Sequence, residues 1–173
     1  MNIRAHWVRF ALGLSLLSAT GWLSACASTS ANSAQAQARV HTELAARYYQ
    51  AGQVAVAVQE AQIALDSDAG YVPGHTLLAL IYAQLRQNAQ ADAHFRQALS
   101  LSEAQRLPTS DLRNSYAWYL CQTDRMAQGL NELSPVLRDP LYGSLDKALV
   151  NASVCAARLE QYELADSYIN AAL

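Results

Sequence analysis

The stretch that decides the fold runs from Thr42 to Leu65, TELAARYYQAGQVAVAVQEAQIAL, because it returns 34 residues later as Thr76 to Leu99, TLLALIYAQLRQNAQADAHFRQAL. Six positions match, and most of them hold small or aromatic residues. A fixed period of about 20 to 50 residues is typical of proteins that stack one structural unit on the next. The matched pairs are Ala45 and Ala79, Tyr48 and Tyr82, Ala57 and Ala91, Ala61 and Phe95, Ala64 and Ala98, and Leu65 and Leu99.

The period and residue types resemble the tetratricopeptide (TPR) repeat, which is a pair of antiparallel helices. In that repeat, small residues lie where the helices approach closely, and an aromatic residue fills the adjoining gap. An ordinary amphipathic bundle repeats apolar residues every three or four positions but does not hold a register of 34. The resemblance implies an all-α superhelix of helix pairs.

Two further units follow, each with a small insertion. NSYAWYLCQTDRMAQGLNELSPVL (114–137) aligns 38 residues after the second stretch, and NASVCAARLEQYELADSYINAAL (151–173) aligns a further 36 residues on. The added residues fall around Pro108 and Pro140, where loops are expected. We therefore predict about four TPR repeats, over 38–71, 72–105, 110–143 and 146–173.

Two features depart from the ideal repeat. Pro135 lies inside the second helix of the third unit, where it should bend or shorten that helix. The chain ends at Leu173 without a polar capping helix, so we expect the natural protein to continue past this residue.

Composition agrees with a helical binding module. The 173 residues are 52% hydrophobic and 15% charged, with seven Gly and four Pro, which favours one domain of packed helices. The formal net charge is −2, and no Lys/Arg run is present, so nucleic acid is not an expected partner.

The N-terminus indicates export followed by lipid attachment. Arg4 and Arg9 accompany the short apolar run FALGLSLLSATGWL, which is too short to span a bilayer comfortably. The next residues complete LSAC (23–26), which resembles the lipobox of bacterial lipoproteins, whose Cys is acylated and begins the mature chain. We expect a signal peptide over 1–25 and lipid on Cys26; a plain cleaved signal or an uncleaved anchor are the alternatives.

The residue after Cys26 bears on location. Bacterial lipoproteins with Asp at that position usually stay in the inner membrane, so Ala27 implies the outer membrane. Residues 26–37 are small and polar, which predicts a flexible tether between the lipid and a TPR domain over 38–173.

Cys121 and Cys155 fall at nearly equivalent places on the first helices of adjacent units. An oxidising periplasm permits a disulfide between them, and two small buried hydrophobic residues are the alternative. A metal site is not expected, because no further ligand pair has suitable spacing and His41, His75 and His94 are isolated from one another.

Motifs for chemistry are absent from the sequence. It has no GxSxG, no HExxH and no glycine-rich phosphate loop. We therefore expect neither an enzyme nor a small-molecule substrate, and no cofactor beyond the lipid on Cys26.

TPR arrays hold a segment of another protein in a concave groove lined by the first helix of each unit. The resemblance maps Ala46, Ala83 and Cys121 to groove positions, and large apolar groups such as Tyr49, Leu80 and Trp118 would form a binding strip. Trp118 is alternatively buried between units. The partner-binding candidates are Thr42, Tyr49, Thr76, Leu80, Asn114 and Trp118.

The strings NSYAWYLCQ, DPLY and NASVCAARL resemble the third and fourth repeats of the PilF/PilW family of outer-membrane TPR lipoproteins of type IV pilus biogenesis. The resemblance implies a pilotin, which binds the pilus secretin subunit and promotes its outer-membrane localisation and multimerisation. It also implies about six repeats in the full family. The alternative is a TPR scaffold lipoprotein for peptidoglycan enzymes or outer-membrane protein assembly, against which these strings argue.

Overall fold

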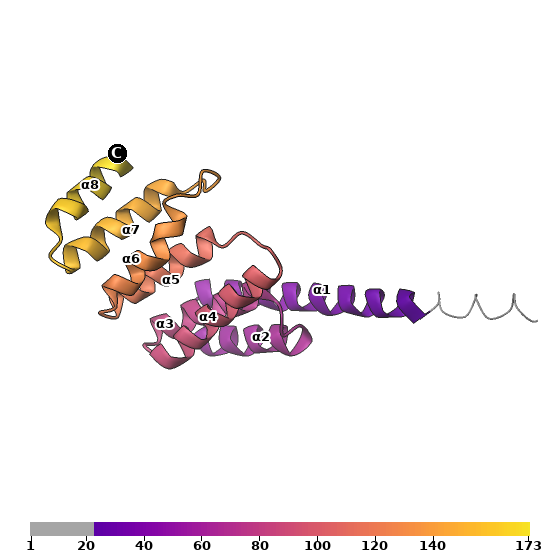
Figure 1. Cartoon of the computed structure of the whole chain (residues 1–173). Helices are drawn as coiled ribbons and strands as arrows, with labels where there is room; N and C mark the ends of the chain where they lie inside the picture. Colours follow the sequence, from indigo (N-terminus) through magenta and orange to yellow (C-terminus); the bar gives the residue numbers. More distant parts are fainter. Residues whose placement is uncertain (1–22) are drawn as a thin grey trace, which may run out of the picture.

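The computed structural model describes residues 23–173, with side chains from residue 32 onward. Within these residues all regular structure is α-helical (Figure 1). Residues 1–22, which make up most of the expected signal peptide, lie outside the described residues. The helices are α1 (Leu23–Gln50), α2 (Val54–Ser67), α3 (Val72–Gln84), α4 (Asn88–Ala104), α5 (Ser110–Gln122), α6 (Met126–Val136), α7 (Leu145–Arg158) and α8 (Tyr162–Ala172).

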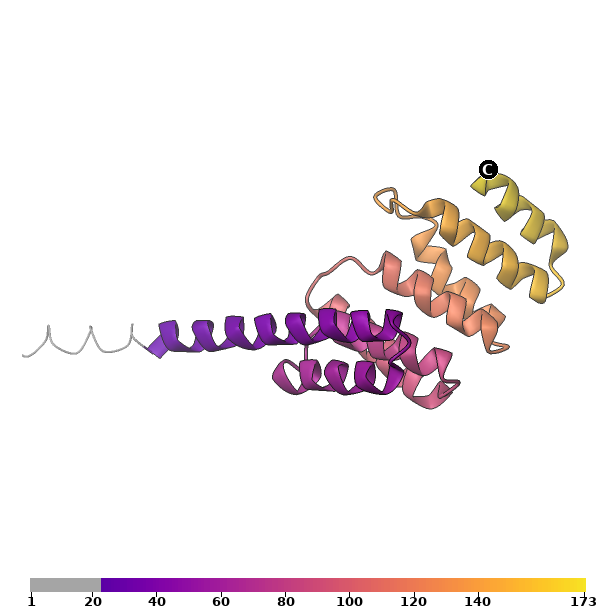
Figure 2. The ribbon, with the colours of Figure 1, turned by 180° about the vertical axis from the view of Figure 1, so that it is seen from behind.

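These helices pack as four pairs, α1 with α2, α3 with α4, α5 with α6 and α7 with α8. Each pair is one TPR unit, and successive units stack into a curved row (Figures 1 and 2). Each unit contacts mainly its neighbours, which is the defining property of a solenoid. The predicted all-α TPR superhelix with about four repeats is confirmed.

The turn inside each unit repeats the register read from the sequence. One residue per turn has a positive φ: Gly52 (75°), Arg86 (59°), Asp124 (58°) and Glu160 (61°), which are 34, 38 and 36 residues apart. The next amide donates back to the carbonyl five residues earlier in each turn, closing a Schellman motif. Glycine is favoured at the positive φ, so three of the four turns hold a strained side-chain-bearing residue.

Small buried residues let the helices approach closely, as the matched positions predict. In the first two units Ala45, Ala57, Ala61, Ala64, Ala79, Ala91 and Ala98 are all fully buried. The larger buried groups fall into three clusters, one at each junction between neighbouring units. The core is therefore distributed along the row and is not gathered at one centre.

The junction between the second and third units is built from large side chains. Phe95 stacks on Tyr116 and Tyr119, with ring centroids 4.9 and 5.5 Å apart. Tyr116 donates to Asp92 at 3.2 Å, and Arg125 pairs with the other oxygen of Asp92 at 2.5 Å. Burial, reinforced by the charge of Asp92, raises the pKa of Tyr116 to about 12. The α4 and α5 backbones lie close together over a shorter length than α2 and α3 or α6 and α7 do.

The junction between the third and fourth units is compact by contrast. Cys121 on α5 and Cys155 on α7 are joined by a disulfide, with Cα atoms 5.4 Å apart. Gly129 on α6 lies against it: a Cβ there would stand 2.5 Å from the Cys121 Sγ and 3.0 Å from the Ala117 carbonyl oxygen. A glycine is therefore required for α6 to pack at this distance.

Helix α6 ends at Val136, one residue after Pro135. It has 11 residues, whereas α4, the corresponding helix of the second unit, has 17. Helix α6 is therefore shorter than its counterpart, as the sequence predicts, and it runs through Pro135 before it ends.

Residues 27–37 belong to helix α1, which differs from the flexible coil expected there. Alanine and glutamine favour helix, and no Gly or Pro interrupts the segment from Leu23 to Gln50. Because the first TPR unit already nucleates α1, each added residue gains a hydrogen bond at little cost. The extension projects well beyond the rest of the molecule (Figures 1 and 2). No helix in the described part of the chain is long and apolar enough to cross a bilayer.

Candidate functional site: a groove along α3, α5 and α7

Three adjoining hollows form a groove lined by the odd-numbered helices α3, α5 and α7. Leu80 and Ser115 border all three hollows, and Trp118 borders two of them. The first hollow, of about 360 Å³, lies between α3 and α5, and the second, of about 410 Å³, reaches α7. The third, of about 350 Å³, extends toward the N-terminal ends of α3 and α5. We call this surface the groove.

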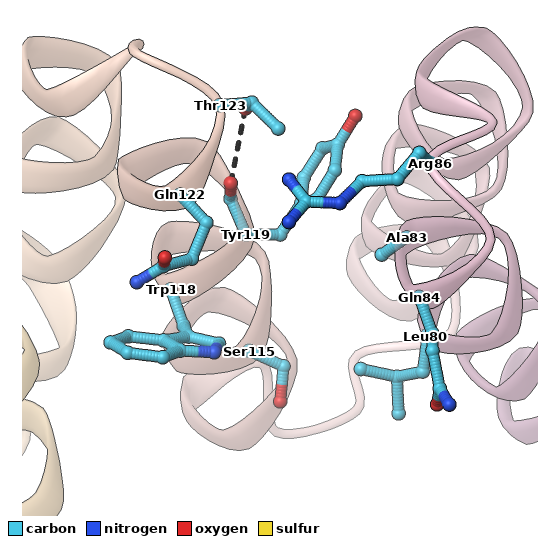
Figure 3. A pocket seen from close by; sticks show the side chains of 9 residues that line it. All are labelled: Leu80, Ala83, Gln84, Arg86, Ser115, Trp118, Tyr119, Gln122 and Thr123. Atoms are coloured by element: carbon cyan, nitrogen blue, oxygen red, sulfur yellow. Dashed lines mark hydrogen bonds between the residues drawn. The ribbon is translucent and has the colours of Figure 1, made fainter.

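Two large apolar side chains border the same two hollows of the groove. Leu80 on α3 is 38% exposed and Trp118 on α5 is 44% exposed. Figure 3 shows them on facing helices, with Ser115 between them in this view. Trp118 is therefore not buried between units. Apolar groups held open to water inside a concave surface are typical of a binding site.

Polar groups surround this apolar centre. Asn151 on α7 donates to the Asn114 side-chain oxygen on α5 at 2.9 Å, which ties the two helices together at the second hollow. Asp146 and Lys147 border the same hollow. Such a rim fixes the orientation of a bound segment, while the apolar centre supplies most of the affinity.

The fourth unit contributes a residue that the sequence mapping missed. Val150 on α7 is 41% exposed and lines the second hollow beside Trp118. Val150 stands 36 residues after Asn114, the offset between the third and fourth units, so the repeat register could have identified it as a groove position. The mapping ended at the third unit and therefore left Val150 out.

Two other candidates lie at or near the groove. Thr76 lines the third hollow, where its hydroxyl donates to the Val72 carbonyl at 2.9 Å. The Tyr49 hydroxyl donates to the side-chain oxygen of Gln84, which lines the first hollow. Tyr49 is thus bound to the edge of the groove and does not stand free in it.

Of the mapped positions, Thr42, Ala46, Tyr49 and Cys121 border none of the three hollows, and two of these four are buried. Thr42 is only 8% exposed, because Gly74 lets α3 come so close to α1 that a Cβ at Gly74 would lie 3.5 Å from the Thr42 hydroxyl oxygen. Cys121 is fully buried in its disulfide. Both positions turn toward the neighbouring unit, and neither is accessible to a partner in this structure.

The expectation that the three histidines are isolated is wrong for His75 and His94. Their Nδ1 atoms lie 3.0 Å apart, between α3 and α4. Burial, with the neighbouring His75, lowers the pKa of His94. His41 instead contacts Glu60 at 2.7 Å. No group of three or more His, Cys, Asp or Glu suited to a metal ion occurs among the described residues.

Comparison with known proteins agrees with this architecture. The family model for the tetratricopeptide repeat matches residues 72–105, which contain α3 and α4. The crystal structure of PilW, a widely conserved type IV pilus biogenesis factor, has a TM-score of 0.73 and 30% sequence identity to this chain. The chain is a TPR protein structurally similar to PilW and PilF. The PilW match covers 79% of this chain and 60% of PilW.

Two further relatives are similar over comparable lengths. PilF of Pseudomonas aeruginosa has a TM-score of 0.75 at 20% identity, covering 82% of this TPR chain and 62% of PilF, and this likeness concerns the fold alone. An uncharacterized protein of Haemophilus influenzae is 28% identical over 143 residues, which is 82% of this chain and 78% of that protein. The chain thus spans about three fifths of the length of the two solved structures.

Proposed function

We propose that this protein is a pilotin: an outer-membrane TPR lipoprotein that binds the type IV pilus secretin subunit and promotes its localisation and multimerisation. The proposal rests on one observation above all, the exposed Leu80 and Trp118 pair in a concave groove of a chain that is 30% identical to a type IV pilus biogenesis factor. TPR proteins use such grooves to hold segments of other proteins.

The sequence strings that resemble the pilotin family support the same role. NSYAWYLCQ lies in α5 and carries both Trp118 of the groove and Cys121 of the disulfide. NASVCAARL lies along α7 and its turn, and carries Cys155 and the Asn151 that bonds Asn114. The residues behind the resemblance are therefore those that shape the groove and fix its far wall.

Membrane attachment in this proposal comes from lipid on Cys26, which would hold the protein on the periplasmic side of the outer membrane. Among the residues whose side chains are described, from 32 onward, Ala38 is the first that is buried. At about 1.5 Å per helical residue, the part of α1 between Cys26 and Ala38 spans about 18 Å. The extension of α1 would then act as a helical spacer between the membrane and the groove.

Capture of secretin from envelope extracts tests the groove. We expect the wild-type chain to recover secretin, and Trp118→Ala or Leu80→Glu to lose it while the circular dichroism spectrum stays unchanged. Ile63→Glu is the matched control, because Ile63 on α2 is also exposed, at 41%, and borders none of the three hollows. Equal capture by all variants would contradict the groove.

The same experiment separates the proposal from its rival. Recovery of peptidoglycan enzymes or barrel-assembly proteins in place of secretin would favour the scaffold function. Cys26→Ser tests the anchor separately: we expect the variant to leave the membrane fraction, and continued membrane association would argue against lipidation.

A further inference from the structure

In each of the first three units, one residue of the first helix contacts the residue 19 positions later, on the second helix. The pairs are His41 with Glu60, His75 with His94 and Arg113 with Glu132; each pair spans 19 residues, and the pairs follow the 34- and 38-residue register. The first and third units place a basic group against a carboxylate, at 2.7 and 2.5 Å. The second unit alone places two imidazoles together.

The geometry of this pair leaves two nitrogen atoms converging. The Nδ1 atoms of His75 and His94 lie 3.0 Å apart, with ring centroids separated by 5.2 Å and rings tilted by 39°. His75 Nε2 lies 3.1 Å from the Ala69 carbonyl oxygen, which can only accept, so this nitrogen carries the proton. The lone pair of His75 Nδ1 is therefore directed at His94. A backbone carbonyl on the far nitrogen is the usual support of a metal-binding histidine.

Tyr82 holds the second imidazole in place. Its ring stacks on His94 with centroids 5.5 Å apart and an interplanar angle of 23°. Both imidazoles are thus oriented by neighbours before any ligand arrives, His75 by a hydrogen bond and His94 by stacking. Preorganised ligands of this kind lose little freedom when they bind.

We propose that His75 and His94 form a two-imidazole site for a transition-metal cation of the Zn²⁺ or Cu²⁺ class. The Nδ1 atom of each residue would bind the ion, and water would complete its coordination. The ion replaces the proton between the two Nδ1 atoms. His94 loses that proton to solvent and takes one up at Nε2, so both imidazoles remain neutral ligands. Imidazole nitrogen suits these metals, whereas Mg²⁺ and Ca²⁺ prefer oxygen ligands.

The nitrogen separation fits this class of ion. With metal–nitrogen bonds of about 2.0 Å, two ligands lie about 2.8 Å apart at a right angle and about 3.3 Å apart at the tetrahedral angle. The observed 3.0 Å falls between these values. Because the lone pair of His75 Nδ1 now points at His94, each ring must turn by about 35 to 45° to direct its lone pair at the ion. Binding would clasp α3 to α4.

Zinc titration of the full chain, purified without a histidine tag, tests the site. We expect the wild type to bind one Zn²⁺ per chain. His75→Gln and His94→Gln should each weaken that binding about tenfold or more, since even supporting groups around a metal contribute 10- to 100-fold. His41→Gln is the matched control, because His41 occupies the same position in the first unit, and it should bind zinc as the wild type does. Equal zinc binding by all three variants would overturn the site.

Paramagnetic resonance of the Cu²⁺ complex gives a second readout that does not depend on affinity. We expect coupling to two imidazole nitrogens in the wild type and to one in either glutamine variant. His94→Glu is a further variant built to fold, because it copies the His41 and Glu60 contact of the first unit. An unchanged nitrogen count in His94→Glu would show that the copper lies elsewhere and would refute the proposal.

Discussion

The packing of Gly129 against the disulfide yields a prediction whose sign depends on two opposing effects. Alanine normally stabilises a helix relative to glycine, by about 1 kcal/mol. At this position, however, the added Cβ would stand 2.5 Å from the Cys121 Sγ and 3.0 Å from the Ala117 carbonyl oxygen. The sulfur is held by its bond to Cys155, and the oxygen belongs to the α5 backbone, so neither moves freely.

Overpacking of this kind typically costs about 1 to 3 kcal/mol. Both close contacts fall on restrained atoms, so we take the upper part of that range and subtract the helix gain. We expect Gly129→Ala to lower the free energy of unfolding by about 1 to 2 kcal/mol. Urea unfolding followed by circular dichroism measures this difference.

A mutant cycle isolates the cause. In a Cys121→Ala, Cys155→Ala background the sulfur is gone, and the new methyl enters the space it leaves. Gly129→Ala should there be close to neutral, which gives a coupling of about 1 to 2 kcal/mol. Gly143→Ala is the control, because a Cβ at Gly143 meets nothing within 4 Å. If Gly129→Ala stabilises the disulfide-bonded protein as an ordinary helical substitution does, the steric reasoning is wrong.

Replacing both Cys121 and Cys155 by Ala should lower stability by about 3 to 4 kcal/mol, from opening a loop of 34 residues, and a smaller loss on urea unfolding would indicate structure retained in the unfolded chain. Glu160→Gly should raise stability by about 0.5 to 1 kcal/mol, because it relieves the positive φ of 61°, and thermal unfolding should show a higher midpoint. The pKa of Tyr116 is raised from 10 to about 12, so its phenol stabilises the fold fully below about pH 10 and loses that contribution as pH rises toward 12. Ultraviolet titration should therefore show one tyrosine that ionises late in the wild type and is missing in Tyr116→Phe.

The sequence was sufficient for the repeat register because close helix packing requires small residues at fixed positions. Ala79 and Ala91 are small, fully buried residues at such positions, and the turn residue Arg86 follows the same period. Leu80 and Trp118 were identifiable for a related reason: the register places them on the inner face, where large apolar groups are unexpected.

Other features depend on how deeply a side chain is buried, which the spacing of residues along the chain does not indicate. Thr42 occupies a groove position by count, yet Gly74 draws α3 over it, and only the fold reveals that approach. The meeting of His75 and His94 was recoverable in principle, since the 19-residue offset that pairs His41 with Glu60 also pairs them. The helical state of residues 27–37 depended on nucleation by the first repeat, which composition alone did not indicate.

The position of the groove follows from the different sizes of the side chains at successive junctions. Between the second and third units, Phe95 stacks on the tyrosines of α5, and the α4 and α5 backbones lie close together over a shorter length than the facing helices of the other junctions do. Between the third and fourth units, Gly129 and the disulfide draw the helices together. A regular TPR array distributes its curvature evenly, whereas here a junction with a short close approach is followed by a tight, cross-linked one. The hollows bordered by Leu80 and Trp118 therefore lie beside this change in spacing, and the cross-link holds α5, which carries Trp118, to α7.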